Sequence, residues 1–589
     1  MLDSAERLHV LVWAPFAKRV DLKLVAPLAR TFALDSIDGG YWSATLEGIA
    51  AGTRYFFRLN NERDRADPAS RSQPEGVHGS SEIVDEPFPW TDGAWRGRSL
   101  RDMTIYELHI GAFSPTGTFA GVIERLDELV DLGINTVEVM PIAQFPGERN
   151  WGYDGVFPFA AQNSYGGRHE FKRLVDACHA RGLSVILDVV YNHLGPEGNY
   201  LADFGPYFTN KYQTPWGAAL NFDGPQGEGV RRYFLANALQ WMTDCHVDGF
   251  RLDAVHAIFD NSERHFLQEL ADTVHALGRS LNREVVLIAE TNKNDPLIVT
   301  PSDEGGLGLD GQWPDDFGRS LQGLLTGDRF GYYADFGTVE HVAKAYREAF
   351  VLTGQYSHYR GRSHGQSAAH VPADRFVVCV QNHDQVGNRA GSDRLSQLVD
   401  IESLKLAAAT VILSPYVPLL FMGEEYGETA PFNYFIDHAD RTLCKAVHRG
   451  RIAEFILHAW QETPPHPKAR RTFEASKLDH DRKHLGHHAE LREYYRHLLQ
   501  LREELPAIRE PRRDHSEVVS EIGRQLLIAH RWCDEGEIVL VLNFSERTQP
   551  FLLPQSKQNQ PWQLAFQSAS ADEGRIARRS ALLFCCGKQ

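Results

Sequence analysis

The segment Val247-Asp-Gly-Phe-Arg-Leu-Asp-Ala-Val-His256 places an arginine and an acid where they could do chemistry. It is typical of a short β-strand, in which successive side chains point to opposite faces. Arg251 and Asp253 would therefore share one face, with Phe250 and Leu252 on the other. A permanent cation beside Asp253 would keep that carboxylate ionised, as a nucleophile requires. A buried ion pair with a purely structural role is the alternative interpretation.

Polar side chains also follow other predicted strands. Glu290 comes directly after the apolar run 285–289, and partial burial would raise its pKa as a general acid requires. Glycoside cleavage with retention needs two carboxyls about 5 Å apart, one as the nucleophile and one as the acid. A metal hydrolase is the alternative, with ligands drawn from Asp188, His193, His383 and Asp384. We expect no metal, because no His-x-His pair ends the first strand and no lysine or cysteine at a strand end could bridge ligands.

Aromatic residues on the predicted loops favour the glycoside interpretation. Tyr153, Trp216 and Trp313 lie on such loops, as do Trp151 and the pair Tyr207-Phe208. Flat ring faces can stack on sugar rings. Core packing is the alternative for any one of these rings, but a cluster on loops indicates a carbohydrate cleft.

Predicted strands and helices alternate through the middle of the chain. Eight strands are expected, with helical patterns between most of them, over residues 104–110, 135–140, 183–190, 247–252, 284–289, 309–313, 375–381 and 417–421. This alternation predicts a closed (β/α)8 TIM barrel, whose reactive side chains lie at the carboxyl ends of the strands. We assign the barrel to residues 93–508, with a loop excursion over its mouth at about 191–229.

Short alternating runs flank the barrel on both sides. Residues 1–92 are expected to form an N-terminal β-sandwich followed by a linker, and residues 509–589 a C-terminal antiparallel β domain. The chain is thus predicted to be a three-domain protein built around a central barrel.

Composition narrows the possible partners. The net charge of −17 argues against nucleic acid and anionic membrane surfaces, because phosphate binding depends on clustered lysine and arginine. The seven cysteines show no Cys-x-x-Cys spacing, which indicates reduced thiols and a cytoplasmic location. Residues 406–423 are apolar, but Pro415 and Pro418 divide them, so we predict a helix, a turn and a buried strand rather than a membrane span.

Four separated segments resemble, in order, the signature regions of the α-amylase family of glycoside hydrolases. They are Asp188-Val-Val-Tyr-Asn-His193, Gly249 to His256, Ala289-Glu290 and Asn382-His-Asp384. The resemblance implies Asp253 as nucleophile, Glu290 as general acid/base and Asp384 as a third acid that holds substrate hydroxyls. It also implies that the attacked glucose is lined by Tyr153, His193, Arg251 and His383.

Three further segments are similar to the trehalohydrolase subfamily. They are 140–156, 354–365 and 381–389. This resemblance implies hydrolysis of the α-1,4 bond next to the terminal trehalose of maltooligosyl trehalose, with an α-glucan as the substrate class, no cofactor, and maltooligosyl trehalose synthase as a possible metabolic partner. A glycogen branching enzyme is the first alternative and a debranching α-1,6 hydrolase the second. An inactive glucan-binding relative is the alternative from a different class.

The same resemblance implies which other side chains contact the sugar. They are Asp188, His256, Trp313, Asp315, Asp316, Phe317, Gln385 and Asn388, together with Trp216. Within this set, Trp216, Asp315 and Gln385 are the candidates for recognising the trehalose end.

Overall fold

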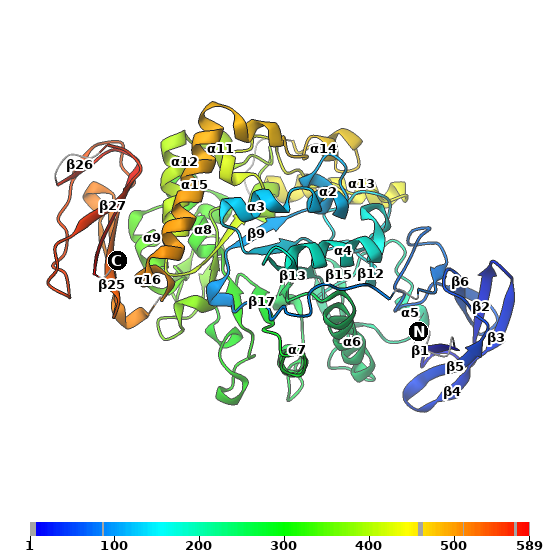
Figure 1. Cartoon of the computed structure of the whole chain (residues 1–589). Helices are drawn as coiled ribbons and strands as arrows, with labels where there is room; N and C mark the ends of the chain where they lie inside the picture. The colour runs from blue at the N-terminus through cyan, green and yellow to red at the C-terminus, as the bar shows by residue number, and fades with distance from the viewer. Residues whose placement is uncertain (1–6, 85–86, 458–462, 511, 571–573, 588–589) are drawn as a thin grey trace.

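The computed structural model describes residues 7–84, 87–457, 463–510, 512–570 and 574–587. Figure 1 shows a central body of strands and helices with a smaller β structure at each end. The predicted architecture is confirmed. The expected N-terminal domain (1–92) and C-terminal domain (509–589) are covered only in part, because residues 1–6 and 588–589 lie outside the described residues.

The N-terminal part forms two antiparallel sheets. One has the strand order β1-β5-β4 and the other the order β3-β2-β6-β7, with β8 paired to β6. Strand β1 alternates exposed and buried residues, as a sheet with one face on a core requires. The strands are β1 (Arg7–Trp13), β2 (Val20–Ala26), β3 (Arg30–Ala33), β4 (Asp35–Ile37), β5 (Tyr41–Glu47), β6 (Arg54–Leu59), β7 (Arg63–Arg65) and β8 (Ser81–Glu82).

Eight parallel strands form the barrel in the order β18-β17-β16-β13-β10-β9-β22-β21. A parallel bridge between Gln312 and Phe376 joins the two end strands and closes the cylinder. The strands are β9 (Ile105–Leu108), β10 (Thr136–Val139), β13 (Ser184–Val189), β16 (Gly249–Leu252), β17 (Val286–Glu290), β18 (Gly311–Trp313), β21 (Val377–Val378) and β22 (Val417–Phe421). A strand was predicted over 375–381, but β21 is shorter. It pairs with β22 at two residues only, and the chain then turns to the polar segment at Gln381.

Helices surround the barrel, as Figure 1 shows. The stretch 119–132 forms two helices rather than one, because Arg125 leaves the helical region with φ −118° and ψ 3°. The main helices are α2 (Phe119–Ile123), α3 (Leu126–Leu132), α4 (Gly167–His179), α6 (Gly227–Cys245), α7 (Phe266–Leu281), α8 (Asp315–Thr326), α9 (Val339–Glu348), α10 (His383–Gly387), α12 (Ile401–Ile412), α13 (Arg441–Leu457), α15 (Gly486–Glu504) and α16 (Pro506–Arg509).

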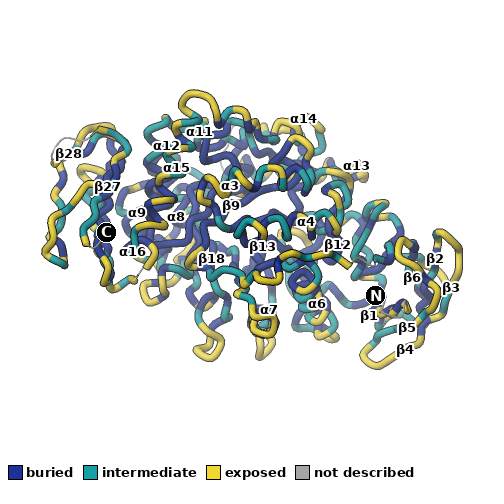
Figure 2. Tube along the Cα trace, in the orientation of Figure 1, coloured by how far each residue is buried: buried dark blue, intermediate teal, exposed yellow. Residues whose placement is uncertain are grey.

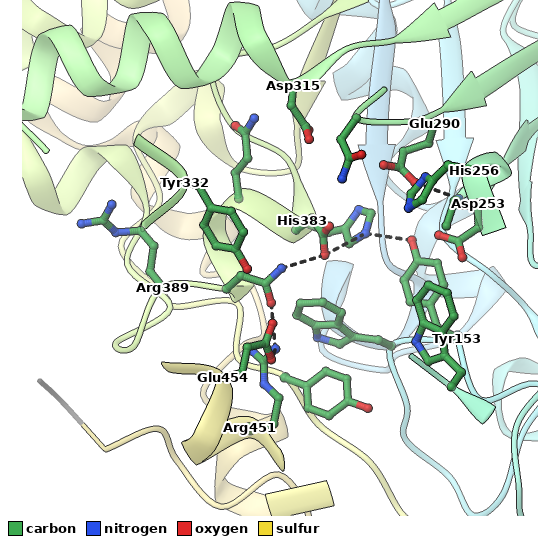
Figure 3. A pocket seen from close by; sticks show the side chains of 18 of the residues that line it. Tyr153, Asp253, His256, Glu290, Asp315, Tyr332, His383, Arg389, Arg451 and Glu454 are labelled. Atoms are coloured by element: carbon green, nitrogen blue, oxygen red, sulfur yellow. Dashed lines mark hydrogen bonds and ion pairs between the residues drawn. The ribbon is translucent and has the colours of Figure 1, made fainter. Parts of the chain in front are cut away.

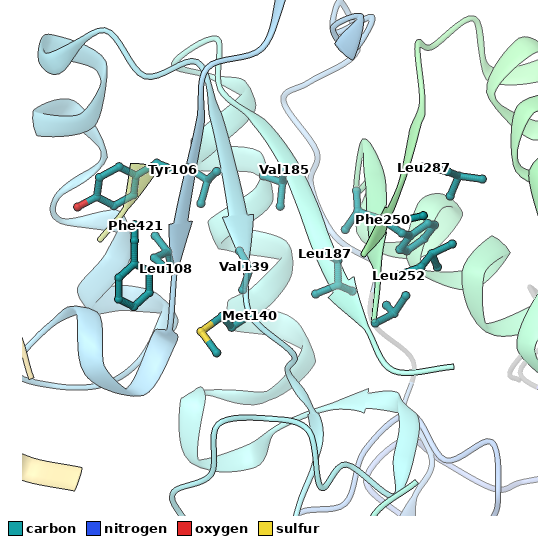
Figure 4. Close-up of a cluster of buried hydrophobic side chains, with 14 of the residues drawn as sticks. Tyr106, Leu108, Val139, Met140, Val185, Leu187, Phe250, Leu252, Leu287 and Phe421 are labelled. Atoms are coloured by element: carbon teal, nitrogen blue, oxygen red, sulfur yellow. The ribbon is translucent and has the colours of Figure 1, made fainter. Parts of the chain in front are cut away.

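Each barrel strand is buried on both faces, and the apolar side chains of the two faces belong to different cores. Outward-pointing side chains such as Leu108, Val139 and Leu252 pack between the strands and the helices, in the cluster drawn in Figure 4. Inward-pointing side chains such as Ile186 and Ile288 form a separate cluster inside the cylinder. Figure 2 shows the same layering, with buried chain in the central body and exposed chain at its loops. This double burial explains why the strands appear as continuous apolar runs in the sequence.

The expected excursion after β13 contains a short helix, α5 (Leu201–Phe204), and a hairpin of β14 (Phe208–Thr214) and β15 (Gly217–Leu220). Trp216 lies in the turn of this hairpin. The segment 406–423 is a helix end, a turn and strand β22, as predicted. Within the described residues, no helix is both long enough and apolar enough to cross a membrane.

The C-terminal part is an antiparallel sheet of order β23-β24-β25-β29-β27, with a small pair β26-β28. It packs beside α12 and α16 of the barrel. Its strands are β23 (Ser516–Glu521), β24 (Leu526–Cys533), β25 (Gly536–Asn543), β26 (Gln549–Pro550), β27 (Gln563–Gln567), β28 (Arg575–Ile576) and β29 (Ser580–Gly587).

Candidate active site

A pocket opens at the carboxyl ends of the barrel strands, where a TIM barrel carries its reactive groups. Eleven of the predicted site residues line it, and they are Tyr153, His193, Trp216, Asp253, His256, Glu290, Asp315, His383, Asp384, Gln385 and Asn388. Figure 3 shows Asp253, Glu290 and His256 on one side of this pocket. The structure thus brings together residues that lie more than 200 positions apart in the chain.

Arg251 is the charged centre behind the pocket. Its guanidinium donates to Asp253 Oδ1 at 2.9 Å, to Asp188 Oδ2 at 2.9 Å, and lies 3.6 Å from Glu290 Oε2. Its side chain is only 2% exposed, and the face of Trp313 covers it at 4.9 Å. One buried cation therefore contacts both carboxyls that the sequence marks as nucleophile and acid. The sequence left two interpretations of Arg251 and Asp253 open, a nucleophile with its cation or a purely structural ion pair. The ion pair faces a cavity rather than a closed core, which favours the first.

Asp253 is held from two sides. Arg251 binds its Oδ1, and Asn192 Nδ2 donates to its Oδ2 at 2.9 Å. The same Asn192 uses its Oδ1 to bond His193 Nδ1 at 2.7 Å, and His193 Nε2 bonds the carbonyl of Tyr153 at 3.0 Å. Hydrogen bonds to both oxygens fix the direction of the Asp253 carboxyl.

Glu290 has a different environment. The amide of Ala254 donates to its Oε2 at 2.8 Å, and Ala254 adopts a left-handed backbone with φ 38°. Burial, reinforced by the charges of Asp253, Asp315 and Asp384 and opposed by Arg251, raises the pKa of Glu290 to about 8. Glu290 therefore carries its proton at neutral pH, while Asp253 receives two hydrogen bonds. Two carboxyls in such unlike surroundings suit the roles of acid and nucleophile.

His383 is part of a buried hydrogen-bonded chain. Its Nδ1 contacts Glu107 Oε1, its Nε2 lies 2.8 Å from the Tyr153 hydroxyl, and that hydroxyl donates to Asp188 Oδ2 at 2.7 Å. Although burial opposes its charge, the Glu107 carboxylate raises the pKa of His383 to about 9. His383 thus presents an imidazolium to the pocket. Sequence reasoning did not single out Glu107, although an acid on the inward face of the predicted strand 104–110 was a usable signal.

Asp384 is the most accessible of the three acids. It lies in the first turn of α10, and its side chain is 57% exposed. Asn388 Nδ2 donates to its Oδ1 at 3.1 Å. The carboxylate therefore projects into the space where a substrate hydroxyl could reach it.

Five predicted contact residues do not line the pocket. Asp188, Arg251 and Trp313 are buried behind its lining. Asp316 accepts hydrogen bonds from the amides of Val351 and Leu352 at 2.8 Å each.

The fifth, Phe317, stacks on Tyr346 with ring centroids 5.8 Å apart. Because α8 begins at Asp315, successive residues turn away by about 100°, so only Asp315 of this trio faces the cavity. Among the loop aromatics, Tyr207 is also absent from the lining and packs edge-on against Trp13 at 5.1 Å.

Trp151, one of the loop aromatics expected at a carbohydrate cleft, also lines the pocket, as does Ala254 of the signature segment 249–256. Other lining residues were not singled out by the sequence. They are Asp154, Asn292, Arg319, Tyr332, Tyr333, Arg389, Tyr434, Arg451 and Glu454. Arg319 stands one turn after Asp315 on α8 and pairs with it at 2.7 Å, so helical spacing could have found it. Arg451 and Glu454 belong to α13, and no motif in that stretch of sequence marks them.

The described residues contain no group of three or more His, Cys, Asp or Glu side chains arranged to hold a metal ion. Three acids of the pocket lie beside protein cations: Asp253 beside Arg251, Asp315 beside Arg319 and Asp384 beside His383.

The chain is similar to known proteins in sequence and in fold. The family described as "Alpha amylase, catalytic domain" matches residues 71–216, and "Carbohydrate-binding module 48 (Isoamylase N-terminal domain)" matches residues 2–72. Malto-oligosyltrehalose trehalohydrolase of Saccharolobus solfataricus is 49% identical over 79% of this chain and 81% of its own. The enzyme of the same name from Rhizobium sp. is 43% identical over 91% of each chain. A crystal structure described as a putative alpha amylase from Salmonella typhimurium is 36% identical, covers 99% of this chain and 98% of its own, and superposes with a TM-score of 0.91.

Proposed function

Because this chain belongs to the malto-oligosyltrehalose trehalohydrolases of the α-amylase family, we propose that it hydrolyses the α-1,4 bond next to the terminal trehalose of maltooligosyl trehalose. The products are free trehalose and a shortened maltooligosaccharide. The observation that carries the proposal is the contact of one buried guanidinium with both Asp253 and Glu290 at the mouth of the barrel. The substrate itself is inferred from the names of the relatives.

The first step forms a covalent intermediate. A carboxylate oxygen of Asp253 attacks the anomeric carbon of the glucose joined to trehalose, and Glu290 gives its proton to the glycosidic oxygen. The carbon–oxygen bond breaks, trehalose leaves, and the glucose remains as an ester on Asp253. Arg251 donates to Asp253 Oδ1 and so orients that carboxyl for attack, while burial raises the pKa of Glu290 and favours its protonated form.

The second step returns the enzyme to its starting state. Glu290, now ionised, takes a proton from water, and the water oxygen attacks the anomeric carbon from the side that trehalose left. The ester bond breaks and Asp253 recovers its carboxylate. Two inversions at the same carbon leave the product with the α configuration of the substrate.

The remaining polar residues hold the sugar during these steps. Asp384 accepts hydrogen bonds from ring hydroxyls, and the His383 imidazolium lies beside them as a positive charge. Trp216 stacks on His193 with ring centroids 4.4 Å apart and an angle of 6°, so its outer face is available for a sugar ring. Trp216, Asp315 and Gln385 stay our candidates for recognising the trehalose end.

Several broader assignments follow from the same proposal. The match to a carbohydrate-binding module and to an amylase domain supports an α-glucan as the bound polymer class. We assign the catalytic barrel to residues 93–508, between β domains at 1–92 and 509–589. All seven cysteines are free thiols, which suits a reducing compartment such as the cytoplasm. A maltooligosyl trehalose synthase would supply the substrate.

The test compares two substrates that differ at one end. Purified protein is incubated with maltopentaose and, separately, with maltooligosyl trehalose, and the products are resolved by chromatography. We expect rapid release of trehalose from the second and little action on the first. Trehalose release by a mock preparation that lacks this protein would reveal a contaminating enzyme. New α-1,6 linkages from amylose, without trehalose, would instead assign the chain to branching chemistry.

A further inference from the structure

Asn388 makes the hydrogen bond that orients Asp384. Its side chain is more than half exposed, and Asn388, one turn later, donates from Nδ2 to its Oδ1 at 3.1 Å. An exposed carboxylate rotates freely unless such a bond holds it. The orientation of Asp384 before substrate binds is therefore set by the amide of Asn388.

The amide of Asn388 is itself fixed by a residue from another part of the fold. An amide has an accepting oxygen and a donating nitrogen, and its partners decide which way it faces. Arg451 Nη1 donates to Asn388 Oδ1 at 2.8 Å. Because an arginine can only donate, it must face the oxygen, and the NH2 group is then left to point at Asp384.

Arg451 is well placed to act as a fixed support. Its Nη2 donates to the carbonyl of Gly387, at the end of α10, at 2.8 Å, and Glu454 lies 3.0 Å from its Nη1. The rings of Tyr434 and Phe455 lie 4.9 and 4.7 Å from its guanidinium carbon. The side chain is 13% exposed. Figure 3 shows Arg451 and Glu454 across the pocket from Asp253.

We propose that Arg451 is a positioning residue for the third acid, acting from α13 on Asp384 through the amide of Asn388. The assignment rests on the proposed function, since it takes Asp384 as part of the reacting site. It makes helix α13, which follows the last barrel strand, a working part of the site built by α10. The planar fork of arginine is required, because it bonds an amide and a carbonyl at the same time.

A direct contact with sugar is the competing role, because Arg451 also lines the pocket. The two roles differ in kinetics. Loss of a group that binds sugar equally in the ground and transition states raises KM and leaves kcat unchanged. Misplacement of Asp384 lowers kcat, because the acid acts on the distorted sugar of the transition state.

The test uses Arg451→Met, Arg451→Lys and Asn388→Ala, with Arg449→Met as the matched control. Arg449 is exposed on the same helix, so its variant should keep parental kinetics and melting temperature. We expect Arg451→Met to lower kcat about tenfold to a hundredfold with KM changed little. Arg451→Lys should rescue only a small part, and Arg451→Met combined with Asn388→Ala should be no slower than Asn388→Ala alone, because the two residues act in series.

Three results would overturn the proposal: parental kcat in Arg451→Met, a change confined to KM, or additive losses in the double variant. If Arg451→Met fails to fold, Asn388→Ala decides, since a parental kcat there removes the relay. The parental enzyme is assayed first on maltooligosyl trehalose. If it releases no trehalose but converts amylose, the proposed function fails, and the same variants are compared on amylose.

Discussion

At the scale of single residues, Asp253 and Glu290 both contact Arg251 but differ in their surroundings. Their loss should therefore have different effects. Asp253→Asn keeps the shape of the side chain but removes the nucleophile, so kcat should fall by about four orders of magnitude or more. Glu290→Gln removes the proton donor and should cost about 10²–10⁴-fold. Trehalose release in a timed assay gives both rates.

Both variants should keep the parental circular dichroism spectrum, because each replacement preserves volume. Near-parental turnover in either would mean that its role has been assigned to the wrong residue.

The raised pKa of Glu290 predicts the alkaline side of the pH profile. The first step needs the protonated acid, and its pKa is about 8, so kcat/KM should fall tenfold per pH unit above pH 8. Asp315→Asn removes a carboxylate whose charge raises that pKa, and should move the fall to lower pH. Initial rates from pH 5 to pH 10 locate the midpoint in each enzyme. A parental profile that stays flat through pH 9 would contradict the assignment of Glu290 as the acid.

At the scale of secondary-structure elements, the spacing of β16 and β17 depends on Gly249. A Cβ at this position would lie 2.1 Å from the carbonyl oxygen of Val286 on β17. Gly249→Ala should therefore push the two strands apart and destabilise the barrel by about 1–3 kcal/mol or more. It should also separate Arg251 from Glu290, so that activity falls at temperatures where the variant is still folded.

Thermal unfolding followed by circular dichroism, with activity measured well below the transition, checks both effects. Gly523→Ala is the matched control, since a Cβ there meets nothing within 4 Å. Equal melting temperatures for the two variants would show that the strands can accommodate the methyl group.

Much of the arrangement of strands, and of the acids at their ends, could be predicted from the sequence. The eight barrel strands were predictable, because burial on both faces leaves continuous apolar runs that end in polar residues. The three acids were predictable because each follows such a run.

Glu107 and Arg451 were harder to find for different reasons. Glu107 lies within a strand rather than at its end, so only its place as an acid on the inward face marks it. Arg451 reaches the site from α13 by tertiary packing alone. Asp316 and Phe317 were wrongly expected at the pocket, because the rotation of α8 after Asp315 was not taken into account.

At the scale of the whole molecule, the N-terminal sheets contact the barrel at the excursion that follows β13. Trp13 of β1 packs edge-on against Tyr207 in the excursion, and Arg65 of β7 donates to Asp203 of α5 at 2.6 Å. These contacts fasten the N-terminal part to the same excursion whose hairpin carries Trp216 into the pocket. The N-terminal part can thus influence the site by holding that excursion in place.

The segment that links the two parts is held by a buried network on the opposite face of the barrel. Asp92 accepts hydrogen bonds from His179 at 2.9 Å, from His246 at 2.7 Å and from Arg283 at 3.0 Å. The other nitrogen of His179 bonds Asp248 at 2.9 Å. Trp95 and Trp90 stack on His179 and His246. One linker carboxylate therefore ties together the ends of α4 and α6 and the segment after α7.

Asp92→Asn should weaken this network in a pH-dependent way. Although burial opposes its charge, hydrogen bonds to Asp248 and Asp92 raise the pKa of His179. A raised pKa in the folded state stabilises the fold fully below the ordinary value of about 6.5, and the contribution is lost as pH rises through the raised pKa. The variant should lose about 3–5 kcal/mol, as expected when one partner of a buried ion pair is removed. The difference in melting temperature between parent and variant should be larger at pH 6 than at pH 9, while trehalose release at 25 °C stays close to parental because the network lies away from the pocket.

Asp127→Asn is the control, since it breaks an exposed pair with Arg181 and should change the melting temperature little at either pH. A deficit of the same size at both pH values would mean that Asp92 acts through Arg283 alone, and the protonated His179 would then have no part in holding the linker.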